Sequence, residues 1–389
     1  MLTEKMTETD IDIAIIGGGN AGLSLAAQLA SQPSPPSTVV IESQGVDQRD
    51  CSWGLWALDQ QAQQLSHSTK GRWQRWQLVD SHSRIIHSSN QFNYLSLSSA
   101  DYLRHCAAQL REPVSLVNAS VNALKPELSQ TVVNTDQRQY RAKTVYDSRP
   151  PQVVENGLRQ HFFGLHIRSK QPLVEPDIAT LMDFRVDQSR GLHFIYALPF
   201  SQHHLLVEST LISTNVEPQD WYRNAIEEWL RNNNIEVAEI ISEERGIIPM
   251  DKLVQAPAIG PSAELPLIAP IGAASGAVRR SSGYAFQHIQ QQVRQLAAGI
   301  AQGTMEVPTP ISSRLTAMDT IFNGVLLSRP DLSVSLYMRM ARALNGDQFA
   351  RFMLGRATVS DWLRVIAAMP KGVFLKEVLK MASGTPADA

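Results

Sequence analysis

The feature that most constrains the fold is a glycine-rich turn close to the N-terminus. An apolar run at residues 11–16 predicts a short buried strand, and residues 23–30 predict a helix. Between them, the spacing Gly-x-Gly-x-x-Gly falls on Gly17, Gly19 and Gly22. The first glycine permits a tight turn, the second lets the backbone approach a pyrophosphate, and the third lets the helix pack against the strand.

The residues that follow complete a dinucleotide-binding pattern. Asn20 and Ala21 stand at the start of the helix, where free N–H groups favour phosphate. A second apolar strand at 39–41 ends in Glu42, where an acid accepts hydrogen bonds from an adenosine ribose. The pattern predicts a Rossmann-like domain that binds FAD or NAD, and its position near the N-terminus is typical of FAD-binding proteins. A βαβ unit without a ligand is the alternative.

The composition limits the other functions. The chain has 389 residues, enough for two domains with a sizeable core. Its net charge of −2 gives no electrostatic reason to expect nucleic acid as a partner. Two cysteines, Cys51 and Cys106, are too few for a disulfide framework, and the ten histidines lack a metal-binding spacing, so we expect no metal site. No apolar run approaches the ~20 residues of a membrane-spanning helix.

Beyond residue 150, the sequence pattern predicts consecutive strands rather than alternating strands and helices. Strand-like runs with short polar connections between residues 160 and 212 predict an antiparallel sheet. The two prolines at 150 and 151 mark a crossover between domains, because proline cannot continue a strand ladder. We expect a mixed α/β fold similar to the ring-hydroxylase and glutathione-reductase flavoproteins. Its parts are an FAD-binding domain (1–150 and 245–305), a substrate-binding sheet domain (151–244) and a helical C-terminal region (306–389).

Several different short motifs are spread along the chain. They are Ile16 to Leu23, Asp147-Ser148-Arg149, Met182 to Arg185, Phe194 to Pro199, Leu206 to Thr210, Glu244 to Met250, and Gly272 to Gly276 with Ser282-Gly283-Tyr284. In this order they resemble the flavin-dependent lycopene cyclase family, and its bacterial β-cyclase branch in particular. Each motif alone would be weak, whereas their joint order is specific.

The resemblance implies a reaction and a cofactor. Such cyclases convert the open ψ ends of lycopene, or of a related ψ-ended carotenoid, into β-ionone rings, giving γ-carotene and then β-carotene. No atoms are gained or lost, although the FAD is needed in its reduced form, with NAD(P)H as the expected electron source. Because an alkene is a weak base, the acid that protonates it must stay neutral in an apolar pocket. The resulting cation needs a negative neighbour.

Glu208 and Asp183 are the candidates for the acid. Glu208 lies in the apolar run Leu205 to Ile212, where a carboxylate is costly unless it is paired or neutral. The family's strand often carries two adjacent glutamates, but here the first is Val207, so only Glu208 can inherit the role. A glutamate on the solvent face of an edge strand is the alternative. For Asp183, a structural pair with Arg185 suits the pattern as well as an acid role does.

Other residues are expected near the substrate and the flavin. Phe194 and Tyr196 would line a polyene pocket, with core packing as the alternative. Asp147 and Arg149 would border the flavin, unless they form a surface ion pair at the crossover. The resemblance also implies flavin contacts at Gly272, Ala273, Gly283 and Tyr284. Many flavoproteins have aspartate where this chain has Ala273, which puts that contact with the ribityl chain in doubt.

The substrate also implies a membrane. Lycopene dissolves in bilayers, so a chain without a spanning segment would dock peripherally, and on the cytoplasmic side because no signal peptide is visible. Residues 335–344 and 349–354 mix apolar and arginine positions, as an interfacial helix would. The same pattern suits an amphipathic helix packed on the protein body. The oligomeric state stays open.

Two other enzyme classes share this type of fold. A ring-hydroxylase-type FAD monooxygenase would use NAD(P)H and consume oxygen, and an isoprenoid double-bond reductase would add two hydrogens to its substrate. The mass of the product separates both from a cyclase. A non-catalytic flavin- or carotenoid-binding protein is the remaining alternative.

Overall fold

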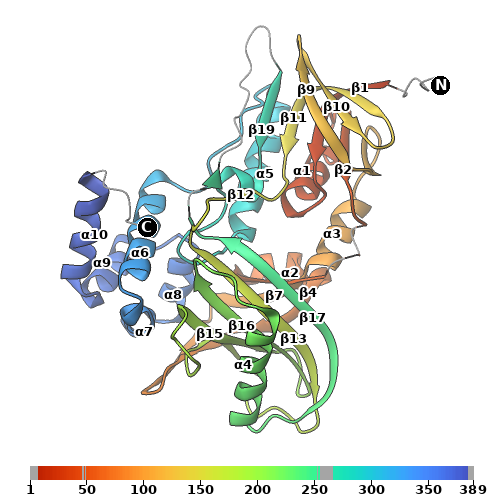
Figure 1. Cartoon of the computed structure of the whole chain (residues 1–389). Helices are drawn as coiled ribbons and strands as arrows, with labels where there is room; N and C mark the ends of the chain where they lie inside the picture. Colours follow the sequence, from red (N-terminus) through yellow and green to blue (C-terminus); the bar gives the residue numbers. More distant parts are fainter. Residues whose placement is uncertain (1–7, 46–47, 49, 252, 255–265, 384–389) are drawn as a thin grey trace.

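Two large β-sheets and a group of C-terminal helices build the molecule, with the first sheet at the top of Figure 1, the second below it and the helices to one side. This computed structural model describes residues 8–45, 48, 50–251, 253–254 and 266–383.

The first sheet carries the glycine-rich turn, and its strand order is β8-β2-β1-β11-β10-β9, with β19 beside β11. The pairs β8–β2, β2–β1, β1–β11 and β11–β19 are parallel, as a Rossmann-like domain requires, whereas β10 pairs antiparallel with β9 and β11. The strands are β1 Glu8–Ile16, β2 Thr38–Glu42, β8 Val114–Asn118, β9 Val121–Glu127, β10 Gln130–Thr135, β11 Gln139–Asp147 and β19 Leu267–Pro270.

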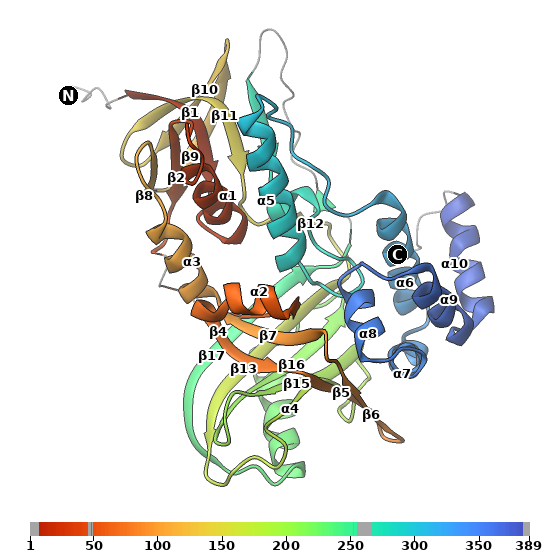
Figure 2. The same ribbon diagram turned by 180° about the vertical axis from the view of Figure 1, so that it is seen from behind.

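Three helices cover one face of this sheet. They are α1 Asn20–Ala30, α3 Ser99–Ala108 and α5 Phe286–Ala301, and Figure 2 shows α1 beside α5. Their apolar side chains form one buried cluster with Ile13 and Ile15 of β1. The short 3-10 turn η2 (Gly272–Ser275) follows β19 and contacts α1, so two segments far apart in sequence meet at the carboxyl edge of the sheet.

The second sheet has the order β17-β13-β16-β15-β14-β5-β6. Its neighbours are antiparallel except for β14 and β5. The strands are β5 Arg75–Val79, β6 Arg84–Ser88, β13 Arg159–Ser169, β14 Ile178–Asp183, β15 Leu192–Pro199, β16 His204–Ser213 and β17 Val237–Pro249. Helix α4 (Gln219–Asn232) packs its apolar side on one face of the sheet, and the other face meets aromatic residues of the N-terminal segment.

The tryptophan-rich segment between residues 52 and 98 forms strands that the sequence analysis did not anticipate. A small sheet contains β3 Ser52–Leu58, β4 Thr69–Trp73 and β7 Phe92–Ser98, with α2 Asp59–Gln64 and the 3-10 turn η1 Ser66–Ser68 between its strands. Although β5 and β6 lie within 1–150, they extend the second sheet, and β17 runs across the expected boundary at 245. Strands β12 Gln152–Val153 and β18 Leu253–Val254 pair where the chain crosses between the large sheets.

The C-terminal region is helical, as expected, with residues 384–389 outside the described part. Its elements are α6 Ser313–Ser328, η3 Pro330–Leu332, α7 Ser333–Ala343, α8 Gly346–Met353, α9 Val359–Ala368 and α10 Lys371–Ser383. The segment 335–344 packs on the protein body, because its apolar side chains are buried in the same cluster as the second sheet. No helix among the described residues has both the length and the apolar character to cross a bilayer.

A buried ion pair fastens α6 to the loop that precedes α5. Arg279 donates from Nε and Nη2 to the two carboxylate oxygens of Asp319, at 2.8 Å each, and both side chains are almost fully buried. Asn323 Nδ2 donates to the carbonyl oxygens of Met250 and Arg280, at 2.6 and 2.9 Å. The C-terminal helices are therefore fixed to the end of β17 and to the loop at 276–285.

Candidate active site

The glycine-rich turn has the geometry that its sequence predicts. Gly17 has a φ of +93°, a conformation that glycine adopts without strain. A Cβ on Gly22 would lie 2.0 Å from the Gly17 carbonyl oxygen, so α1 approaches the turn more closely than any larger residue would allow. The Ser148 hydroxyl lies 2.8 and 3.0 Å from the carbonyl oxygens of Ile16 and Gly17, and it fixes the turn as a donor.

The start of α1 faces open space. Gly19 is the N-cap, no side chain caps the helix, and a Cβ on Gly19 would meet no atom within 4 Å. Glu42 lies beside this turn, where its two carboxylate oxygens accept from the N–H groups of Gly18 and Gln44, at 2.5 and 2.9 Å. Asn20 Oδ1 accepts from Gln290 of α5 at 2.8 Å. An uncapped helix N-terminus beside a carboxylate suits a pyrophosphate and its ribose.

Other predicted cofactor residues meet the same turn. Gly272 has a φ of +66°, and a Cβ on it would lie 2.6 Å from the Cβ of Ala21, so the turn that contains Ala273 packs directly on α1. Asp147 ends β11 and forms a bidentate ion pair with Arg149. The Arg149 backbone lies close to the glycine turn, because a Cβ built on Gly17 would be 3.6 Å from the Arg149 nitrogen. The structure therefore brings the glycine turn, the Asp147–Arg149 pair and the 272–276 turn together.

A row of residues crosses the face of the second sheet that is turned away from α4. The register pairs Tyr196 of β15 with Glu208 of β16, Glu208 with Gly164 of β13, and Gly164 with Glu244 of β17. Because residues in register point to the same face, both carboxyl groups extend over Gly164. A Cβ on Gly164 would lie 2.7 Å from Cγ of Glu208 and 3.3 Å from Cγ of Glu244.

Glu208 is buried, with 7 % of its surface exposed. Burial, followed by the negative charge of Glu244 and a hydrogen bond between the two carboxyl groups, raises the pKa of Glu208 well above its ordinary value. The environment thus favours the neutral acid. The solvent-exposed edge strand that the sequence left open does not occur, since β16 lies between β13 and β15.

Glu244 is the ionised partner. Burial alone would raise the pKa of Glu244, but hydrogen bonds from His166 and Glu208 lower it below its usual value. Its Oε2 accepts from the Ser52 N–H of β3 at 2.9 Å and lies 3.4 Å from His166 Nε2. Two carboxyls that share one proton, with environments that push their pKa values apart, are a recurrent arrangement for acid–base chemistry.

Three tyrosine hydroxyls meet beside the carboxyl pair. Tyr94 of β7 hydrogen-bonds to Tyr196 at 2.7 Å and to Tyr284 at 3.3 Å between the hydroxyl oxygens. Burial raises the pKa of all three phenols well above the ordinary value, so they stay neutral. Trp56 packs edge-on against Tyr94 and Tyr284, with ring centroids 4.8 and 5.1 Å apart. Aromatic side chains therefore lie beside Glu208.

Asp183 lies away from this group. Its carboxylate accepts from Arg185 and from Trp229 Nε1 of α4, the latter at 2.8 Å, so it belongs to the α4 side of the sheet. The structural Asp–Arg pair therefore occurs, and the structure does not bring Asp183 to Glu208. Phe194 stands two residues before Tyr196 on the same face and packs on Phe184, with a centroid distance of 6.0 Å.

Sequence reasoning did not find Glu244, His166, Ser52 and Tyr94 as site residues. Glu244 stands in the motif that carries the family resemblance, but it is flanked by Glu243 and Arg245, and only the fold shows that it alone of the three is buried. His166 and Tyr94 lie on strands with no local signal of function. Across the part of the chain that the structure describes, no group of three His, Cys, Asp or Glu side chains is arranged to hold a metal ion.

Comparison with solved structures identifies the fold. A geranylgeranyl bacteriochlorophyll reductase-like protein from Thermoplasma acidophilum superposes with a TM-score of 0.62 at 14% identity, covering 96% of this chain and 100% of the other. A flavoprotein/dehydrogenase from Cytophaga hutchinsonii gives 0.60 at 15% identity, with 95% and 100% covered. A flavin-dependent brominase gives 0.59 at 13% identity, with 97% and 100% covered. The chain therefore has the fold of the FAD-dependent flavoproteins, with a helical C-terminal region.

The family follows from the sequence match. The family model described as Lycopene cyclase protein matches residues 12–377, and the chain belongs to this family. A lycopene beta-cyclase from a Paracoccus species is 28% identical over 228 residues, which are 54% of this chain and 56% of that protein. A lycopene beta cyclase from Synechococcus elongatus is 24% identical over 314 residues, 75% and 72% of the two chains. The first of these matches thus spans little more than half of the relative's length.

The raised pKa of Glu208 predicts a pH-dependent difference in stability. The folded chain keeps a proton on Glu208 that the unfolded chain releases above about pH 4.3, so this group's contribution to stability falls as pH rises toward the folded pKa. Glu208→Gln removes that slope. We expect the free energy of unfolding of the variant, relative to wild type, to rise by up to about 1.4 kcal/mol per pH unit between about pH 5 and 7.

Urea unfolding at several pH values measures this difference. The matched control is Glu243→Gln on β17 of the same sheet, where the side chain is exposed and pairs with Arg223 on the opposite face. Parallel pH profiles for Glu208→Gln and wild type would mean that Glu208 is ionised in the folded protein.

Proposed function

We propose that the chain is a lycopene β-cyclase, which closes the ψ ends of lycopene to β rings without a change in mass. Membership of the cyclase family supports this reading. The observation that carries it is the buried pair of Glu208 and Glu244 over Gly164 among aromatic side chains, where the raised pKa of Glu208 favours its neutral form. Such an acid suits protonation of an alkene, because its surroundings favour the form that still carries the proton at neutral pH.

In the proposed reaction, Glu208 donates its proton to C2 of the terminal C1=C2 double bond, and a tertiary cation forms at C1. The C5=C6 electrons then form the C1–C6 bond, which moves the positive charge to C5. Loss of the proton from C6 gives the β ring and returns one proton to the carboxyl pair, so atoms and charge balance. Glu244 would hold negative charge near the cation throughout, because Ser52 and His166 stabilise its ionised form.

The aromatic walls would support the same cation. Faces of tyrosine and tryptophan rings attract positive charge by ~0.5–2 kcal/mol each without reacting as bases. Trp56, Tyr94 and Tyr196 are buried or nearly so around the carboxyl pair, and they exclude water that would quench a carbocation. Tyr196 thus has a role at the substrate in this proposal, whereas Phe194 packs in the wall behind it.

The residues of the first domain fit FAD. The open space at Gly19 and the uncapped start of α1 suit the pyrophosphate, and Glu42 suits the ribose. The 272–276 turn and the Gly283–Tyr284 segment would hold the flavin side. Reduced FAD, with NAD(P)H as the electron source, would supply further negative charge near the cation without transferring a hydride.

The flavoprotein fold would equally suit a monooxygenase or an isoprenoid double-bond reductase, because fold alone does not set the reaction. The paired carboxyls favour proton chemistry over both. Oxygen uptake with NAD(P)H, or a product heavier by two hydrogens, would assign the chain to one of those classes.

Replacing the proposed acid tests the function directly. In lycopene-accumulating bacteria, the wild-type chain should convert the red pigment to orange product of identical mass. Glu208→Gln should lower the rate by about 10²–10⁴-fold, since a general acid contributes that much. Pigment analysis measures the conversion, flavin content checks that the protein is loaded, and Glu243→Gln serves as the control. A Glu208→Gln variant that cyclises at the wild-type rate would remove Glu208 from the reaction.

Filling the space at Gly19 tests the cofactor site. Gly19→Val adds side-chain atoms where no protein atom lies within 4 Å of the Cβ position, so the fold should tolerate it. We expect the purified variant to unfold thermally like flavin-free wild type but to retain little flavin. Absorbance of bound flavin per mole of protein measures the effect. Normal flavin content would place the dinucleotide elsewhere.

A further inference from the structure

A large cavity lies among the C-terminal helices, and neither Glu208 nor Glu244 lines it. Its volume is about 510 Å³, and its wall is mostly apolar. It is lined by side chains of α6, α7, α9 and α10, including Phe322, Met340, Val365 and Phe374. A cavity of this size and character suits a hydrocarbon chain.

The inner end of the cavity reaches the active-site loop. Ser281 and Ser282 line it, and they directly precede Gly283 and Tyr284. Tyr337 on the cavity wall donates to the Ser281 carbonyl oxygen at 3.2 Å and belongs to the same buried cluster as Tyr94 and Phe194. The cavity thus reaches the segment that carries Tyr284, whose hydroxyl bonds to Tyr94 beside the carboxyl pair.

The outer end of the cavity coincides with an exposed apolar surface. Ile366, Leu375 and Val378 line the cavity and are also 49%, 60% and 41% exposed. They continue two helical stripes, which are residues 359, 363 and 366 of α9 and residues 375, 378 and 379 of α10. Val359, Leu363 and Leu379 are more than 60% exposed. Soluble proteins rarely expose so many neighbouring large apolar side chains unless the surface contacts a partner or a membrane.

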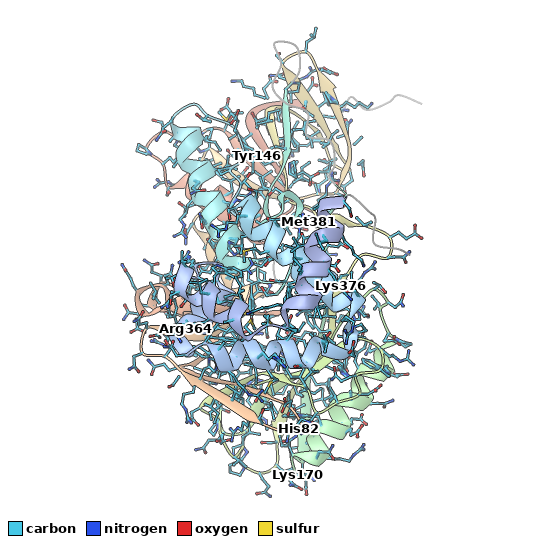
Figure 3. The ribbon with its side chains drawn as sticks, turned by 90° about the vertical axis from the view of Figure 1, so that its left-hand side faces the viewer. His82, Tyr146, Lys170, Arg364, Lys376 and Met381 are labelled. Atoms are coloured by element: carbon cyan, nitrogen blue, oxygen red, sulfur yellow. The ribbon has the colours of Figure 1, made fainter. Side chains whose placement is uncertain are left out.

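Basic side chains flank this apolar face. The described residues of α9 and α10 carry four cations, Arg364, Lys371, Lys376 and Lys380, all of them exposed. Of their two acidic residues, Asp361 is buried against Arg351, and Glu377 is half-buried between α10 and α6, with Lys380 4.0 Å away. Figure 3 views this face, with Arg364 on α9 and Lys376 and Met381 on α10. Apolar stripes bordered by Lys and Arg are the chemistry of helices that lie on anionic lipid.

We propose that the apolar face of α9 and α10 docks on an anionic phospholipid bilayer and that the cavity between these helices is the entrance through which a ψ-ended carotenoid passes from the bilayer to Glu208. The docking part stands on the exposed surface alone, and the entrance part rests on the proposed cyclase function. A carotenoid that enters this way would meet a mostly apolar wall, in which the charges of Arg279 and Asp319 are paired with each other.

Vesicle binding tests the docking face. Flavin-loaded wild type should co-float with phosphatidylcholine vesicles that contain phosphatidylglycerol, and bind them better than pure phosphatidylcholine. Leu363→Ser with Leu379→Ser should weaken binding by about tenfold or more, since two apolar side chains no longer enter the lipid. The control pair is Leu128→Ser with Val174→Ser, which removes apolar side chains that are 78% and 93% exposed elsewhere.

Two results would overturn the docking face. Equal vesicle binding by the Leu363/Leu379 variant and the control pair would place the contact elsewhere. A change from dimer to monomer in that variant, without vesicle binding by wild type, would assign the face to a second copy of the chain.

Blocking the cavity tests the entrance. Gly372 lines the cavity, and a Cβ on it meets no atom within 4 Å, so a large side chain fits the backbone there. Gly372→Trp should lower cyclisation about tenfold or more, with vesicle binding and flavin content unchanged, whereas Gly372→Ala should leave the rate near wild type. Equal rates for the two variants would exclude the cavity as the route.

The way in which lycopene is delivered separates failure of this proposal from failure of the cyclase function. The Leu363/Leu379 variant should lose activity on lycopene in vesicles but keep it on lycopene in detergent micelles, where no bilayer is needed. Absence of turnover by wild type in both forms would overturn the cyclase function and with it the entrance, while vesicle binding would still decide the docking face.

Discussion

The packing of Glu208 and Glu244 over Gly164 is the contact on which the proposed chemistry depends. Two carboxyl groups so close in a buried place cannot both be ionised at modest cost, and the surroundings decide which one keeps the proton. Glu244 receives donors from Ser52 and His166, whereas burial and the charge of Glu244 raise the pKa of Glu208. The difference in pKa between the two glutamates therefore comes from residues on neighbouring strands rather than from the glutamates themselves. Glycine at 164 is what lets their side chains meet.

The group of side chains around the two acids is assembled from segments distant in sequence. The small sheet of β3, β4 and β7 contributes Ser52, Trp56 and Tyr94, and the loop before α5 contributes Tyr284. The second sheet contributes the acids. The glycine turn at the edge of the first sheet and the acid pair on the second are thus joined by residues that belong to neither large sheet. In the proposed function, these residues would connect the cofactor site with the buried acid.

The sequence predicted the parts of this arrangement that have local rules. The glycine spacing predicted the turn and the parallel strands around it. The apolar run around Glu208 allowed either a buried acid or a solvent-facing glutamate, and the family resemblance favoured the acid. The sequence analysis did not identify Glu244 as a site residue, because the strand that carries it is largely exposed and rich in charge. No local pattern marks its one buried carboxyl group. Asp183 gave the opposite difficulty, since an acid in a strand looks alike whether it faces the pocket or, as here, Trp229 of α4. Which face a strand presents, and what covers it, is a tertiary property.

The buried pair of Arg279 and Asp319 has a consequence for how the protein holds together. Arg279 belongs to the segment that leads to Tyr284, and Asp319 belongs to α6, so the arginine's partner for its charge comes from the C-terminal helices. Loss of either member leaves an uncompensated buried ion, at a cost of about 3–5 kcal/mol. A chain that lost the C-terminal helices would therefore also lose the partner that fixes the segment leading to Tyr284. In this family, truncation or replacement of the helical region should be rare unless another residue neutralises Arg279.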